Sequence, residues 1–187
     1  MKSVLISIQP KWCELIANGK KTVEVRKTRP KLDTPFKVYI YCTKSKSYFA
    51  RKHPSIDKAF GGGMVIGEFL CNCFTYIEAG YDTNGNKHLY NTAFIEHRMC
   101  IPDNELHEYL YKSRENTGGW GWHISDLVIY EKPRELSEFY SFKKCTACES
   151  GYESTACIYD EDCKVPAAIT RPPQSWCYVE GSDNNDE

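Results

Sequence analysis

The first 26 residues change their hydrophobic pattern twice, and this constrains the fold more than any other part of the sequence. Residues 4–8 are apolar and mostly β-branched, which predicts a strand. Pro10 then begins a helix, because the first helical position needs no N–H donor. Asn18-Gly19 ends that helix, since glycine readily adopts the left-handed conformation. The chain extends again by residue 22, so a short helix joins two strands and the sequence predicts a mixed α/β fold.

Residues 19–26 read Gly-x-Lys-x-x-Glu-x-Arg and place three charged groups close together. Glu24 and Arg26 share one face of the predicted strand, because side chains alternate along a strand. The Glu24 carboxylate can therefore hold the Arg26 guanidinium in place. Lys21 has the opposite parity and joins them only if the strand bends or begins after it. A plain salt bridge within the strand and a functional cleft both explain this pattern.

Later segments predict further strands and one more helix. Strands are expected at residues 36–42, 64–70 and 123–130, with a hairpin at 81–90. Pro102-Asp103 begins a helix with Leu106, Tyr109 and Leu110 on one face. The segment Gly118-Gly119-Trp120-Gly121-Trp122 is interpreted as a flexible hinge leading into the strand that follows it.

Composition favours a folded protein inside the cell. Hydrophobic residues make up 41% of the chain, which is enough for a core, and no apolar run is long enough to span a membrane. The N-terminus has no apolar leader. The 10 cysteines then indicate reduced thiols and a cytoplasmic location rather than a disulfide framework.

Charge is divided unevenly along the chain. Residues 1–60 contain 14 Lys and Arg but 4 Asp and Glu, whereas the remaining residues contain 10 and 21. A basic half is typical of proteins that bind polyanions, although the acidic half can also balance it internally. Within the basic half, residues 44–63 form a long loop in which Tyr48, Phe49 and Phe60 stand among cations, which suits the stacking of unpaired bases.

Four cysteines near the C-terminus have the spacing of a metal site. Cys145 and Cys148 form a Cys-x-x-Cys pair, and Cys157 and Cys163 follow in a segment with few apolar residues. Four thiolates suit tetrahedral zinc, so a structural zinc is expected here, with Cys177 as a possible substitute ligand. Buried thiols or a disulfide are the alternatives.

The motif resembles the signature of the ASCH domain, the activating signal cointegrator homology domain. Gly19, Lys21, Glu24 and Arg26 stand at its spacing, and Ser7-Ile8-Gln9-Pro10 is similar to the opening of that domain. Residues 122–133 resemble its closing strand. The resemblance implies an α+β fold built on a small PUA-like β-barrel with flanking helices. The expected division is an ASCH-like domain at 1–140, a Cys-rich lobe packed on it at 141–180, and a disordered acidic tail at 181–187.

The resemblance also implies a function. ASCH domains are expected to bind RNA or other single-stranded nucleic acid, so the leading hypothesis is RNA or nucleotide binding in a cleft that carries the motif, with no membrane partner. The residues expected at this site are Lys21, Glu24, Arg26, Arg29, Trp12, Tyr41 and Trp122. The alternative is an amidohydrolase of acetylated cytidine, with Lys21 and Glu24 as its catalytic residues. Small relatives use a Lys, a Thr and a Glu for that reaction, and Glu24 stands where they have the Thr. A regulatory protein-interaction module is a third hypothesis.

Overall fold

The computed structural model describes residues 2–45, 61–112, 117–144 and 164–180. Its elements are β1 (Lys2–Ile8), α1 (Pro10–Ala17), β2 (Val23–Arg26), β3 (Phe36–Cys42), β4 (Met64–Tyr81), β5 (Lys87–Tyr90), α4 (Glu96–Met99), α5 (Asp103–Leu110), β6 (Gly118–Arg134), the 3₁₀ turn η1 (Leu136–Glu138), β7 (Tyr140–Lys144), β8 (Lys164–Ala168) and β9 (Trp176–Glu180). The predicted strand–helix–strand start is confirmed, and β3 has the predicted bounds.

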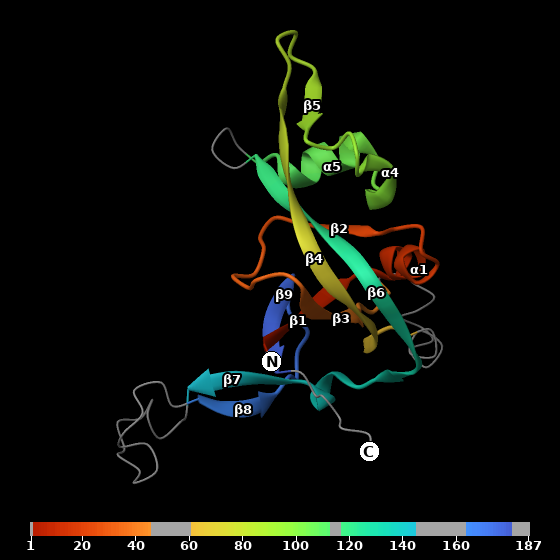
Figure 1. The fold of residues 1–187 in the computed structure, drawn as a ribbon, viewed down its shortest axis with the longest axis vertical. Coiled ribbons are helices and arrows are strands. Elements are labelled where there is room, and N and C mark those ends of the chain that lie inside the picture. The colour runs from red at the N-terminus through yellow and green to blue at the C-terminus, as the bar shows by residue number, and fades with distance from the viewer. Residues whose placement is uncertain (1, 46–60, 113–116, 145–163, 181–187) are drawn as a thin grey trace.

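All the described strands belong to one sheet. Its order is β2-β6-β4-β3-β1-β9-β7-β8, and β5 pairs with β4 outside this path. β4 and β6 form a long antiparallel pair that runs through most of the molecule (Figure 1). The mixed α/β prediction is therefore confirmed. The expected barrel is not, because the path ends at β2 and at β8, and no pairing within the described ranges joins these two strands.

The hinge predicted at residues 118–122 is wrong, because these residues begin β6 and pair with both β2 and β4. Glycine is required there for close packing. A Cβ atom on Gly119 would lie 2.5 Å from Leu110 Cδ2 and 2.8 Å from the carbonyl oxygen of Arg26. The glycines that suggested flexibility instead let β2 and α5 approach β6 closely.

The two faces of β2 have different surroundings. Val23 and Val25 pack in an apolar cluster with Leu106 and Leu110 of α5 and with residues of β4 and α4. Glu24 and Arg26 point the other way, as their parity predicted. β2 thus separates a core from the candidate site.

The C-terminal strand β9 lies between β1 and β7 and pairs with β1 in antiparallel register. Trp176 lies 6.0 Å from Trp122, measured between ring centroids, so an aromatic contact joins this strand to the core. β7 and β8 form a hairpin that projects from the main body (Figure 1). The aromatic residues of the 44–63 loop and the acidic tail at 181–187 lie outside the described residues. No helix in the described ranges is long and apolar enough to cross a membrane.

Candidate functional site

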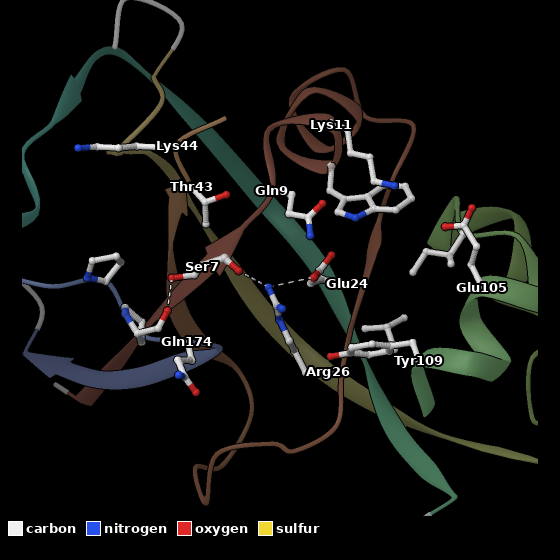
Figure 2. Close-up of a pocket in the computed structure, with 15 residues that line it drawn as sticks. Ser7, Gln9, Lys11, Glu24, Arg26, Thr43, Lys44, Glu105, Tyr109 and Gln174 are labelled. Atoms are coloured by element: carbon white, nitrogen blue, oxygen red, sulfur yellow. Dashed lines mark hydrogen bonds and ion pairs between the residues drawn. The ribbon is translucent and has the colours of Figure 1, made fainter. Parts of the chain in front are cut away.

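A cleft of about 570 Å³ lies beside the polar face of β2 (Figure 2). Five parts of the chain form its walls. They are the end of β1 with the start of α1, β2, the residues after β3, α5 with the connection that precedes it, and the segment before β9. The lining residues are Ser7, Gln9, Lys11, Trp12, Glu24, Val25, Arg26, Thr43, Lys44, Ile101, Glu105, Tyr109, Pro172, Pro173 and Gln174. The motif therefore stands in a cleft that also depends on segments distant in the sequence.

The three charged motif residues form a linear chain of ion pairs. Glu24 Oε2 lies 3.4 Å from Lys21 Nζ, and Glu24 Oε1 lies 3.2 Å from Arg26 Nη2. Lys21 reaches the pair because β2 begins at Val23, after the lysine. Glu24 is 4% exposed, and the two cations on either side of its carboxylate offset part of the cost of burying it.

Lys21 lies behind this pair rather than in the cleft. Its residue exposure is 1%, and its Nζ donates to the carbonyl oxygen of Met99 over 2.5 Å. The Trp12 ring centroid lies 5.1 Å from the same ammonium. Burial lowers the pKa of Lys21, and the neighbouring carboxylate of Glu24 opposes that change. Lys21 therefore positions Glu24 from below the floor of the cleft.

Arg26 is held on one edge only. Its Nη2 donates to the carbonyl oxygen of Ser7 over 2.5 Å and also faces Glu24. Nε is buried without a hydrogen-bond partner among the described residues. Those residues supply no partner for Nη1 either, and the side chain keeps 13% exposure. The guanidinium is thus fixed in orientation while one of its edges remains able to bind an acceptor.

Aromatic rings and cations complete the cleft. Trp12 and Tyr109 supply rings, and Lys11 Nζ lies 4.2 Å from the Trp12 ring centroid. Glu105 and Lys44 add one charge of each sign at other walls (Figure 2). The C-terminal wall is fixed to β1, because Ser7 Oγ donates to the carbonyl oxygen of Pro173 over 2.7 Å.

Besides Lys21, three residues predicted for the site lie outside the cleft. Trp122 has no exposed surface and packs in the core beneath the motif. Tyr41 is 4% exposed and belongs to a different apolar cluster, which includes Leu136 of η1 and Val179 of β9. Arg29 stands on the connection between β2 and β3, where its guanidinium lies 4.3 Å from the Trp120 ring centroid. The cleft thus contains Trp12, Glu24 and Arg26 from the predicted set.

The cleft residues from α5, from the connection before it and from the segment before β9 could not be predicted from local sequence patterns. Helical spacing predicts Tyr109 on the apolar face of its helix, but it is 39% exposed and turns toward the cleft, while Leu106 and Leu110 are buried. Ile101, Glu105 and the 172–174 segment belong to no recognisable motif. Of the lining residues that sequence reasoning missed, Ser7, Gln9 and Val25 belong to the segments on which the resemblance was based.

The predicted zinc ligands Cys145, Cys148, Cys157 and Cys163 lie outside the described residues, so the zinc site remains a prediction. The substitute ligand Cys177 is an unpaired thiol in β9. Within the described ranges, no cluster of His, Cys, Asp and Glu side chains could hold a metal ion.

Comparisons with known proteins agree with the motif. Residues 6–78 match the model of the ASCH domain. The fold is similar to the crystal structure of ASCH from Zymomonas mobilis, with a TM-score of 0.56 and 15% sequence identity over 95% of this chain and 87% of that chain. Two mutants of that protein align with TM-scores of 0.55 at 16% and 17% identity, covering 95% and 96% of this chain and 88% and 91% of theirs. No curated protein matches the sequence significantly. The predicted resemblance to the ASCH domain is confirmed over residues 6–78, and the fold of the chain is similar to that of the ASCH crystal structure.

Proposed function

We propose that this chain, whose residues 6–78 match the ASCH domain, binds RNA by taking an unpaired nucleotide into the cleft. The observation that carries the proposal is that the Arg26 guanidinium is held at Nη2 and is open to a ligand at Nη1. Glu24 and the Ser7 carbonyl fix its Nη2 edge, and the described residues supply no partner for Nη1. A guanidinium held in this way is preorganised to bind a phosphate oxygen or a base carbonyl.

The other groups in the cleft favour a nucleotide over a simple anion. Trp12 and Tyr109 offer rings on which a base can stack. Glu105 offers an acceptor for the amino or ring N–H groups of a base, and it would repel a bare anion. Lys11 and Lys44 can contact phosphate. The basic half of the sequence therefore contributes cations to the candidate site, as expected of an RNA-binding protein.

The amidohydrolase alternative has less support. It needs Lys21 or Glu24 to act directly on a substrate. The lowered pKa of Lys21 favours a reactive neutral amine, but its Nζ is buried against Met99 and Glu24. Incubation of the protein with acetylated cytidine, followed by chromatography, tests this alternative. We expect no release of cytidine.

The proposal predicts that Arg26→Lys weakens RNA binding. An ammonium can replace the charge but cannot contact Glu24 and Ser7 while presenting a second edge to the ligand. We expect about a tenfold loss of affinity, equivalent to about 1.4 kcal/mol. Fluorescence anisotropy with a labelled single-stranded RNA of about 12 nucleotides measures this.

Lys87→Ala is the control, since it removes a whole cation outside the cleft, whereas Arg26→Lys keeps the charge. Lys87 lies on β5 and pairs with Glu108, outside the lining of the cleft. We expect its affinity to equal that of the wild type. Thermal unfolding of both variants separates binding from folding. If Arg26→Lys lost stability but bound RNA like the wild type, the Glu24–Arg26 pair would be a structural bridge only.

A further inference from the structure

A second, more open hollow lies next to the cleft, on the connection between β2 and β3. Its volume is about 660 Å³, and residues 27–33 and Trp120 line it. Lys27 links the two hollows, because it lines the second one while its Nζ lies 4.9 Å from the ring centroid of Tyr109, which lines the first. The inference about the second hollow rests on the proposed function of the cleft. It concerns how many nucleotides of the ligand the protein binds.

The sheet register places aromatic rings beside Arg26. Arg26 pairs with Trp120 across β2 and β6, and Trp120 pairs with Tyr76 across β6 and β4. Residues directly opposite one another in a sheet project from the same face. Neighbouring strands are about 4.8 Å apart, so the floor of the cleft continues directly into a pair of rings. Adjacent nucleotides of one strand can occupy these two positions.

The two rings of this second position lie close together, and that of Tyr76 is exposed while Trp120 is half-buried. The Trp120 and Tyr76 ring centroids lie 5.1 Å apart, and Tyr76 is 42% exposed. Phe74 supports Trp120 from the neighbouring strand at 6.3 Å. Stacked bases bind to such exposed aromatic surfaces with little dependence on sequence.

Three cations, Lys27, Arg29 and Lys31, line the hollow together with Trp120 and Asp33. The Arg29 guanidinium lies 4.3 Å from the Trp120 ring centroid and 5.3 Å from that of Phe74. No ion pair joins Lys27, Arg29 or Lys31 to an acidic group of the described residues. Burial, and then the nearby charge of Lys112, lowers the pKa of Lys27. Like charges held together in this way would be stabilised by phosphate groups.

Hydrogen bonds to β9 hold the connection between β2 and β3 in place. Trp176 Nε1 donates to Thr28 Oγ1 over 3.1 Å, and the backbone N–H of Lys31 donates to the Tyr178 hydroxyl over 2.8 Å. Pro30 is buried. The connection that carries the cations is therefore fixed at both Thr28 and Lys31. Ligand binding then needs little further ordering of its backbone.

We infer that the protein recognises a single strand of RNA of at least two nucleotides, with one base in the cleft and the next on Tyr76 and Trp120. In this arrangement Lys27, Arg29 and Lys31 bind the backbone phosphates. The ligand is therefore an oligonucleotide rather than a free nucleoside.

The test compares two ligands, cytidine monophosphate and an oligocytidylate of about 12 nucleotides, on the full chain. Tyr76→Leu removes the exposed ring, and Tyr76→Phe keeps it. We expect Tyr76→Leu to weaken oligonucleotide binding about 5- to 100-fold, the range for loss of one stacked base. Its affinity for the monophosphate should be unchanged, and Tyr76→Phe should bind both ligands like the wild type.

Arg29→Ala gives a second test at an exposed position that tolerates substitution. It should weaken oligonucleotide binding and reduce the slope of log affinity against log salt by about 0.7, the value for one contact to a single strand. The affinity for the monophosphate should again be unchanged. This variant tests for the second nucleotide position even if Tyr76→Leu is poorly folded.

The outcomes distinguish this inference from the function on which it rests. If Tyr76→Leu and Arg29→Ala bound the oligonucleotide like the wild type while Arg26→Lys bound it weakly, the second position would be refuted and the cleft retained. Equal losses for both ligands would also refute a separate position. If the wild type bound neither ligand, the proposed function and this inference would both be wrong.

Discussion

At the scale of single residues, the most unusual feature is the fully buried ammonium of Lys21. It donates to Met99 and lies 3.4 Å from Glu24. Lys21→Met should lower the free energy of unfolding by about 1–3 kcal/mol, because a buried carbonyl and a buried carboxylate lose a donor. Urea unfolding at neutral pH measures this loss. An unchanged stability would show that the ammonium contributes nothing net.

The pH dependence of stability shows whether the stability difference between the wild type and Lys21→Met comes from the charge of Lys21. Because burial lowers the pKa of Lys21 from its ordinary value of 10.5, the unfolded chain binds this proton more tightly than the folded chain does. Wild-type stability should therefore gain a contribution as pH rises from the lowered value toward 10.5. Lys21→Met lacks this contribution, so the stability of the wild type relative to the variant should increase with pH across that window and stay constant below it.

The same residues show how far sequence reasoning reaches at this scale. The alternation of side chains correctly placed Glu24 and Arg26 on one face. It could not place Lys21, whose orientation depends on where the strand begins. Trp122 and Tyr41 lie on strands, as predicted. Alternation does not tell which face of a sheet is buried, and both faces of β3 are buried here.

At the scale of elements, the close approach of β2, β6 and α5 sets the shape of the cleft. Gly119→Ala should place a methyl group against the Arg26 carbonyl and Leu110, and so move β2 or α5. We expect a loss of about 1–3 kcal/mol in stability together with weaker RNA binding. Gly80→Ala is the control, because its Cβ would lie 3.4 Å from Tyr90, an ordinary contact. Similar behaviour of the two variants in thermal unfolding would contradict this role for Gly119.

The elements also explain why the site was predicted only in part. The strand–helix–strand start and the α5 helix follow from local patterns, since caps and periodicity are local. The approach of α5 to β2, which brings Tyr109 and Glu105 to the motif, is a tertiary contact between segments that are far apart in the sequence. The glycines of β6 suggest a hinge because local sequence does not distinguish flexibility from close packing.

At the scale of the whole molecule, the cleft joins the first described strand to the last. The ASCH match ends at residue 78, yet Pro172, Pro173 and Gln174 form one wall, and Ser7 holds that wall through Pro173 and Ser175. Ser7→Ala removes the hydroxyl that donates to Pro173 and keeps the backbone bond from Ser7 N–H to the Ser175 carbonyl. The C-terminal wall should therefore loosen without leaving the sheet.

We expect Ser7→Ala to lower stability by about 1 kcal/mol, the net value of one hydrogen bond, and to weaken RNA binding as well. Ser125→Ala is the matched control, because the Ser125 hydroxyl donates to the Leu70 carbonyl over 3.1 Å away from the cleft. It should lose similar stability and keep its affinity. Hydrogen exchange should rise at residues 172–175 in Ser7→Ala alone. If both variants kept full affinity, the C-terminal segment would cover the cleft without shaping it, and recognition would depend on the residues of the ASCH match and α5.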